Sequence, residues 1–206
     1  MNTRYRRAHL RAEFYRHSTL WTGAQVLREF GNTPQGGLYG RLAAILFAYL
    51  AFEGMLNHLG EALFPTEWEN ERELFTRPPL KGTLGKLSFL ARRCGVTLHK
   101  GRRPYTTLKL LEKRRSLLVH PRTERQTRTI DFTDPWQLPP MLPSELQDWA
   151  SERSVQRAFE DVEAMAATLV AAARATFPRQ MRRVYGAGFT GAVGTQDGRI
   201  EEGVCA

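Results

Sequence analysis

Cysteine is scarce in this sequence: the 206 residues include only Cys94 and Cys205. Two thiols build neither a disulfide framework nor a zinc site of regular Cys/His spacing, and such scarcity suits the reducing cytosol. Long apolar runs are also missing, because the longest, residues 42–52, lies between Arg41 and Glu53 and is too short to span a bilayer. The charged N-terminal end lacks the apolar region of a signal peptide. We therefore expect a cytoplasmic protein without a membrane segment.

Strand patterns are weak throughout the chain, and helical periodicity dominates. Apolar residues recur at helical spacing over residues 38–63, 83–94, 104–120 and 144–177, and a further helix is expected within 4–30. Turn-forming and proline-containing stretches separate these segments. The sequence therefore predicts an all-α protein, an up-and-down helical bundle with irregular connections.

The domain organisation predicted from these segments is one helical domain with a tail. Residues 1–37 form a basic N-terminal segment, expected to be helical and packed on the bundle, and residues 38–180 form the helical domain. Residues 181–206 are rich in glycine and lose apolar periodicity, which predicts a flexible C-terminal tail. Within the domain, Ser144 and Gln147 have the spacing of a capping box and predict the start of a helix.

Positive charge is concentrated in one stretch of the chain. Residues 100–128 contain ten lysines or arginines and two glutamates, a local surplus of +8 in a chain whose net charge is +9. An excess of this size, with a pI of about 10.1, indicates a polyanionic partner such as RNA, DNA or an anionic membrane face. The alternative is a solvated basic face that binds nothing.

The helix predicted over residues 104–120 carries charged side chains in an otherwise apolar row. Leu111, Arg115 and Leu118 share one stripe, so an arginine interrupts a row that faces the core. Burying a guanidinium group without a counter-charge is costly, and such a residue usually has a partner or lines a cleft. Ser116 and His120 lie four residues apart, on nearly the same face, and His120 precedes a proline that ends the helix.

An arginine beside a histidine at a helix end suits chemistry on a phosphodiester. The imidazole group of His120 can move a proton near neutral pH. The guanidinium group of Arg115 can neutralise charge that builds up on the phosphate oxygens. Arg114 is an alternative to Arg115, since its spacing to His120 is similar.

Two short motifs resemble those of one family. Residues 115–121, Arg-Ser-Leu-Leu-Val-His-Pro, are similar to the Arg-x(4–6)-His signature of HEPN domains, in which the histidine closes a helix. Residues 52–57, Phe-Glu-Gly-Met-Leu-Asn, resemble the aromatic-Glu-x-x-x-Asn pattern of an earlier helix in that family. The resemblance is one of pattern and spacing, and it covers about residues 38–177.

This resemblance implies a HEPN-like helical bundle that acts as a homodimer, with two motif-bearing helix ends facing one cleft. It implies cleavage of RNA by attack of a ribose 2′-hydroxyl group, with neither metal nor cofactor. In that reaction His120 is the general base or acid, Arg115 stabilises the transition state, and Ser116 and Glu53 orient them. The further side chains that we expect to contact the substrate are those of Arg114, Asn57, Arg122 and Lys113.

The family resemblance also implies a biological setting. Such domains are found among the toxins of toxin–antitoxin pairs and the nucleases of antiviral defence. A nucleotidyltransferase-like antitoxin protein is then the expected partner, in addition to RNA.

Several alternatives remain open from the sequence alone. His120 can instead be a helix-end histidine that interacts with free carbonyl groups, and Arg115 can be an ion-pair partner of Glu53. At the level of function, the first alternative is a HEPN-like module that binds RNA or a nucleotide without cleaving it. The second is an adaptor that docks a protein through its long C-terminal helix.

Overall fold

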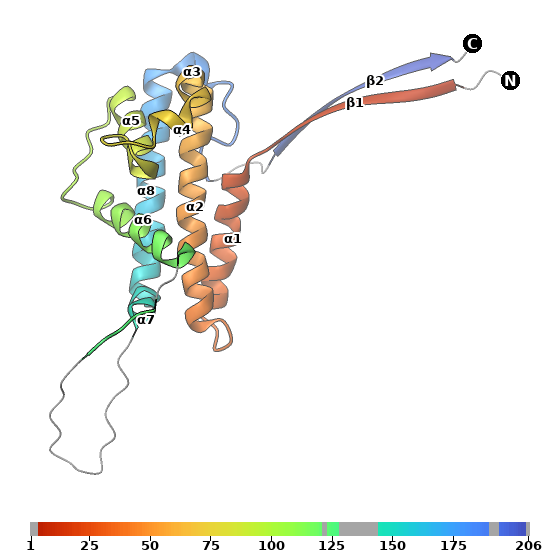
Figure 1. Ribbon diagram of the computed structural model, residues 1–206. Helices are drawn as coiled ribbons and strands as arrows, with labels where there is room; N and C mark the ends of the chain where they lie inside the picture. Colours follow the sequence, from red (N-terminus) through yellow and green to blue (C-terminus); the bar gives the residue numbers. More distant parts are fainter. Residues whose placement is uncertain (1–3, 121–122, 128–143, 190–193, 205–206) are drawn as a thin grey trace, which may run out of the picture.

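The computed structural model of this chain describes residues 4–120, 123–127, 144–189 and 194–204. It is a helical bundle from which a two-stranded ribbon extends (Figure 1). The longer helices are α1 (Arg16–Gly31), α2 (Gly37–Leu63), α5 (Gly82–Arg93), α6 (Tyr105–Val119) and α8 (Glu152–Thr176). The short ones are α3 (Pro65–Glu69), α4 (Glu71–Leu74), α7 (Glu145–Trp149) and α9 (Pro178–Met181). The predicted all-α class is confirmed.

Helix α2 is the centre of the bundle and contacts α1, α5, α6 and α8. It forms an antiparallel hairpin with α1, and the two helices approach closely at Gly31 and Gly40. A Cβ atom added to Gly40 would lie 2.8 Å from the Cα atom of Gly31. Larger residues here would therefore push the hairpin apart.

Helix α2 is also long and apolar enough to cross a membrane by length and composition. Its apolar part therefore extends beyond the run of residues 42–52 noted in the sequence. In the bundle, 56% of its most apolar window is buried, and large side chains such as Phe52, Met55 and Leu56 are fully enclosed. This arrangement is compatible with the core helix of a soluble protein.

Most predicted helix ends agree with the structure. The Ser144 hydroxyl group accepts a hydrogen bond from the Gln147 backbone N–H, and the Gln147 side chain accepts one from the Ser144 backbone, which confirms the capping box. A second cap at Ser151 starts α8, so the helix predicted from residue 144 is in fact two helices, α7 and α8. Gly95, at φ +73°, follows the end of α5 in the left-handed region that glycine adopts readily.

The two ends of the chain form an antiparallel ribbon that was not predicted. Strand β1 (Arg4–Phe14) pairs with β2 (Gly194–Val204), from Arg4 opposite Val204 to Phe14 opposite Gly194. Figure 1 shows the ribbon leading away from the helices. The start of the N-terminal segment is thus a strand where a helix was predicted, and α1 is the helix of that segment. The flexibility predicted for residues 181–206 stays a prediction.

Residues before β2 are likewise packed rather than free. Ala187 is buried, and the ring of Phe189 stacks on Trp21 with the ring centres 4.3 Å apart. The loss of helical periodicity after α9 therefore marks the change from helix to other ordered structure, not the end of the packed part of the chain. Pairing between segments that lie so far apart in the chain leaves no local pattern to detect.

Candidate functional site

Helix α6 carries the predicted motif, and its inner stripe leads directly to Arg115. Leu108 and Leu111 on this stripe are fully buried, whereas Arg115, one turn further along, is half-buried. Arg115 thus lies at the edge of the apolar core. This is the environment that its interrupted pattern predicted, because a guanidinium group is tolerated at the border of a core but not within it.

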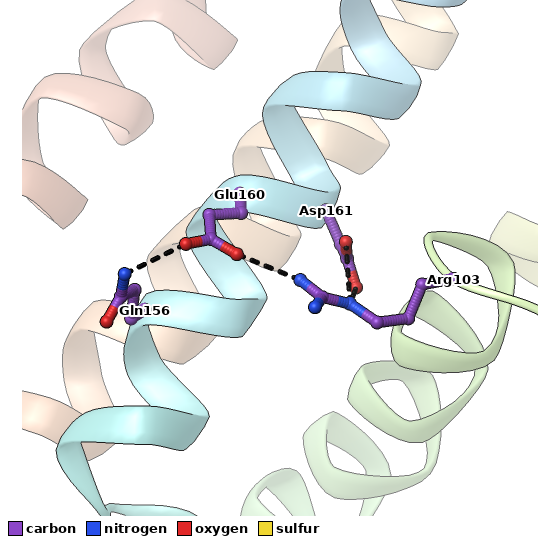
Figure 2. Close-up of polar contacts among 4 residues, drawn as sticks. All are labelled: Arg103, Gln156, Glu160 and Asp161. Atoms are coloured by element: carbon purple, nitrogen blue, oxygen red, sulfur yellow. Dashed lines mark hydrogen bonds and ion pairs between the residues drawn. The ribbon is translucent and has the colours of Figure 1, made fainter.

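An ion-pair network fixes the start of α6 against α8, as Figure 2 shows. The Nε atom of Arg103 donates to both carboxylate oxygens of Asp161, at 2.8 and 3.1 Å, and its Nη2 atom lies 2.9 Å from Oε2 of Glu160. Gln156 in turn donates to Glu160 at 2.9 Å. The hydrogen bond to Asp161 and that to Glu160 raise the pKa of Arg103. Asp161 is buried, so this network sets where α6 begins relative to α8.

A cavity of about 330 Å³ opens beside the motif, between α2, the start of α5 and α6. Helix α2 contributes two residues, the N-cap and first two residues of α5 contribute three, and the second half of α6 contributes three. The lining residues are Tyr49 and Glu53; Lys81, Gly82 and Thr83; and Glu112, Arg115 and Ser116. Three of the four residues predicted as catalytic therefore surround one space.

Two polar atoms at this cavity are buried and lack a hydrogen-bond partner in the described part of the chain: the Tyr49 hydroxyl group and Nε of Arg115. The side chain of Thr83 lies beside Tyr49 but does not meet hydrogen-bond geometry at its hydroxyl group. Burial raises the pKa of Tyr49; Thr83 and Arg115 oppose the rise, and the carboxylates of Glu112 and Glu53 add to it. Tyr49 is therefore a neutral phenol that can donate a hydrogen bond.

One carboxylate at the cavity has a structural partner and the other does not. Oε1 of Glu112 accepts a hydrogen bond from the backbone N–H of Leu84 at 3.4 Å, and so satisfies a free donor at the start of α5. Glu53 forms neither a hydrogen bond nor an ion pair within the described residues. The alternative in which Arg115 is the ion-pair partner of Glu53 is thus not observed.

The two adjacent arginines of the motif point to different places. The guanidinium carbon of Arg114 lies 4.9 Å from the ring centre of Trp149 in α7, a cation–π contact. Burial lowers the pKa of Arg114, and the carboxylate of Glu145 opposes this. Of the two candidates left open by the sequence, Arg115 is the arginine that lines the cavity.

His120 closes α6, as predicted, and its backbone N–H donates to the carbonyl oxygen of Ser116 at 3.0 Å. Its side chain is exposed and is not among the residues that line the cavity. His120 lies one turn beyond Ser116, and with φ −123° and ψ 68° it departs from helical geometry. Lys113 is exposed on the same helix, and Arg122 lies outside the described residues.

Asn57 does not belong to this site. Its Oδ1 atom accepts a hydrogen bond at 2.8 Å from Nζ of Lys86, a buried lysine of α5 that also pairs with Glu71. Sequence analysis did not predict the Lys86–Glu71 pair, because Lys86 lies among apolar residues and Glu71 lies between the predicted helices. The Asn of the predicted Glu-x-x-x-Asn pattern therefore holds α5 on α2 rather than facing Arg115.

The basic stretch over residues 100–128 divides into engaged and free cations. Arg103 is paired with Asp161, Arg114 lies on Trp149, and Arg115 lines the cavity. The exposed members that form no ion pair or ring contact, in the part that the structure describes, are Lys100, Arg102, Lys109, Lys113 and Arg125. The basic surface is consequently smaller than the charge count indicates.

Sequence reasoning missed four polar residues of the cavity: Tyr49, Lys81, Thr83 and Glu112. Tyr49 lies within the helix predicted over residues 38–63, and its spacing of four from Glu53 places both on one face of α2. Thr83 and Glu112 depend on how α5 meets α6, which no local pattern reveals. Elsewhere too, among the residues with described positions, no group of three His, Cys, Asp or Glu side chains is close enough to hold a metal ion.

The fold and the site together define an all-helical protein with a polar cavity beside an Arg–His helix end. No model of a known protein family, no curated protein and no solved structure matches the chain.

Proposed function

We propose that this chain is a HEPN-type endoribonuclease that cleaves RNA without a metal ion. The observation that carries the proposal is the shared cavity of Glu53, Arg115 and Ser116, which come from two helices far apart in the sequence. Arg115 and Ser116 thus line one cavity, and His120 ends the same helix one turn beyond Ser116.

The proposed reaction is an attack of the ribose 2′-oxygen on the adjacent phosphorus atom. The bond from phosphorus to the 5′-oxygen breaks, which leaves a 2′,3′-cyclic phosphate and a 5′-hydroxyl end. His120 accepts the proton of the 2′-hydroxyl group or donates one to the leaving oxygen. Arg115 stabilises the charge on the pentacoordinate phosphate, and Ser116 and Glu53 orient these groups. The need for a 2′-hydroxyl group restricts cleavage to RNA.

The proposal extends to partners. As a homodimer, the protein presents two copies of His120 and Arg115 to one RNA strand, and exposed cations such as Lys109 and Lys113 contact its phosphates. Binding that depends on such contacts weakens steeply as salt is raised. In the cell, the protein acts in this proposal as a toxin or defence nuclease in the cytoplasm, held in check by a nucleotidyltransferase-like antitoxin.

The test incubates the purified protein with total RNA in EDTA and analyses the new RNA ends. We expect cyclic phosphate ends with the wild-type protein and none with His120→Ala or Arg115→Ala. Two matched controls are His99→Ala and Arg92→Ala, which remove an exposed histidine and an exposed arginine away from the cavity. Equal cleavage by His120→Ala and His99→Ala would refute the proposal.

A second candidate is an RNA- or nucleotide-binding module without cleavage activity. It is favoured by the exposed position of His120, which does not line the cavity. This candidate predicts salt-sensitive RNA binding by the wild-type protein and no cyclic phosphate ends at any enzyme concentration. A protein-docking adaptor, in contrast, predicts weak and salt-insensitive association with RNA.

A further inference from the structure

The cavity beside Arg115 has the size and the chemistry of a small-molecule site. Its volume of about 330 Å³ lies at the lower end of the range for ligand pockets. Most of its lining residues carry polar or charged side chains, and they come from α2, α6 and the segment that starts α5, so the site is built by the tertiary fold rather than by one loop. The part of an RNA strand that fits this cavity follows from the charges and the hydrogen-bonding groups of its walls.

The charges on its walls exclude a phosphate group from the interior. Lys81 and Arg115 are balanced by Glu53 and Glu112, so the lining carries no formal net charge. A phosphate inside would lie against two carboxylates, which repel it at short distance. An uncharged group therefore fits the interior better than a phosphate does, and in the proposed reaction the phosphate lies at the rim of the cavity beside Arg115.

The free polar atoms inside the cavity call for a ligand with hydrogen-bonding groups. The side chain of Tyr49 is 1% exposed, and its hydroxyl group has no partner among the described residues. An unpaired buried hydroxyl group is energetically unfavourable, and a ligand that pairs with it removes this cost. Glu53 adds a carboxylate with neither an ion pair nor a hydrogen bond in that same part of the chain.

A carboxylate distinguishes among nucleobases because it can only accept hydrogen bonds when ionised. Guanine presents two adjacent donors, N1–H and the N2 amino group, which match the two oxygens of one carboxylate. Uracil presents a single N–H group between two carbonyl oxygens, and each of these oxygens would face the carboxylate unfavourably. The carbonyl oxygen of guanine remains free to accept from the hydroxyl group of Tyr49 or Thr83.

We infer that this cavity binds the base of one nucleotide next to the cleaved phosphate, and that Glu53 and Tyr49 select guanine there. The inference rests on the proposed function for the identity of the ligand as RNA. Glu53 then recognises the base in addition to orienting the catalytic groups. Recognition of the base also explains why Tyr49 keeps an unpaired hydroxyl group deep in the bundle.

The test measures binding of guanosine, inosine and uridine 3′-monophosphates to the full chain by calorimetry or NMR. These nucleotides share the phosphate and the ribose, and inosine differs from guanosine in lacking the N2 amino group. We expect guanosine monophosphate to bind most tightly and the inosine and uridine compounds about tenfold or more weakly. Equal affinity for the guanosine and uridine compounds would overturn the inference.

Two variants locate the selection within the cavity. Glu53→Gln should reduce the preference for guanosine over inosine and uridine monophosphates by about tenfold. Tyr49→Phe should reduce the preference for guanosine over uridine monophosphate by about tenfold and leave that over inosine unchanged, because the inosine base has the same carbonyl oxygen. Their matched controls on α2 are Glu61→Gln, at an exposed position, and Tyr39→Phe, whose side chain is 79% exposed. Circular dichroism verifies that each variant is folded. An unchanged preference in folded Glu53→Gln would contradict the assignment.

Measurements of binding and of cleavage distinguish a failure of the base pocket from a failure of the proposed nuclease. If guanosine monophosphate binds selectively but no cyclic phosphate ends form, the nuclease fails and the base pocket stands. If RNA is cleaved in a manner that requires His120 but without preference for guanosine beside the cut, the base pocket fails and the nuclease stands.

Discussion

The guanidinium carbon of Arg114 lies 4.9 Å from the ring centre of Trp149, while the next residue, Arg115, lines the cavity between α2 and α6. Two adjacent arginines of one motif thus have different surroundings. One packs on an aromatic ring of α7 and the other faces a polar space. Substitution of Arg114 should therefore mainly reduce stability, whereas substitution of Arg115 should mainly reduce activity.

We predict that Arg114→Ala lowers the free energy of unfolding by about 1 kcal/mol, because it removes a cation–π contact and the packing of the arginine stem. RNA cleavage should change little. Arg115→Ala should lower the cleavage rate about 100-fold or more, because it removes the charge that stabilises the transition state. Urea unfolding and initial rates on one RNA substrate test both. If instead Arg114→Ala lowered the cleavage rate and Arg115→Ala did not, Arg114 would be the arginine that acts in cleavage.

The hydrogen bond from Lys86 to Asn57 leads to a second prediction. Asn57→Ala should lower the free energy of unfolding by about 1–3 kcal/mol, because a buried lysine loses one of its acceptors. It should leave RNA cleavage unchanged, since Asn57 does not line the cavity. The control is a double-mutant cycle with Lys86→Met, in which Asn57→Ala should cost clearly less. A loss of cleavage without a loss of stability would return Asn57 to the site.

Sequence analysis predicted the features that depend on neighbouring residues better than those that depend on contacts between distant segments. The helices and the Ser144 capping box are local features, and their residues already contain the apolar spacing and the capping side chains that define them. Arg115 could be placed at the border of the core for the same reason. A pattern within one helix was sufficient in each of these cases.

The features that sequence analysis missed depend on contacts between distant segments. Strand β1 pairs with β2, although nearly the whole chain separates them. Arg103 was counted as part of a free basic surface, yet Asp161 of α8 neutralises it. The cavity owes its third wall to residues around Thr83, whose position depends on how α5 meets α6. None of these pairings leaves a periodic pattern in the sequence.

Close packing of α3 on α2 gives a third prediction. A Cβ atom added to Gly60 would lie 2.0 Å from ring atoms of Trp68, which is 6% exposed and has little room to move. Gly60→Ala should therefore destabilise the protein by about 1–3 kcal/mol, although alanine itself favours a helix. Gly101→Ala is the control, since a Cβ atom there meets nothing within 4 Å, and its effect should stay within about 0.5 kcal/mol. Thermal unfolding of both variants measures the difference, and equal stability would contradict the close contact.

The last prediction concerns His17, which connects α1 with the segment that precedes β2. Its Nε2 atom lies 2.5 Å from the carbonyl oxygen of Gly186, and its ring centre lies 5.0 Å from that of His58. Burial lowers the pKa of His17 below 6.5; hydrogen bonds with the Gly186 and Gly188 backbones oppose this, and the charge of His58 adds to it. Below pH 6.5 the unfolded chain therefore takes up a proton at this residue that the folded chain does not.

The free energy of unfolding should consequently fall as pH drops from about 6.5 towards the lowered pKa of His17, by at most about 1.4 kcal/mol per pH unit for one group. From this residue we expect no pH dependence above about pH 7, where it is neutral in both states. Urea unfolding between pH 5 and 7.5 measures the slope. His17→Gln should reduce this slope, whereas His99→Gln, at an exposed position, should retain it. An identical slope in wild type and His17→Gln would mean that His17 takes up its proton equally well in the folded bundle.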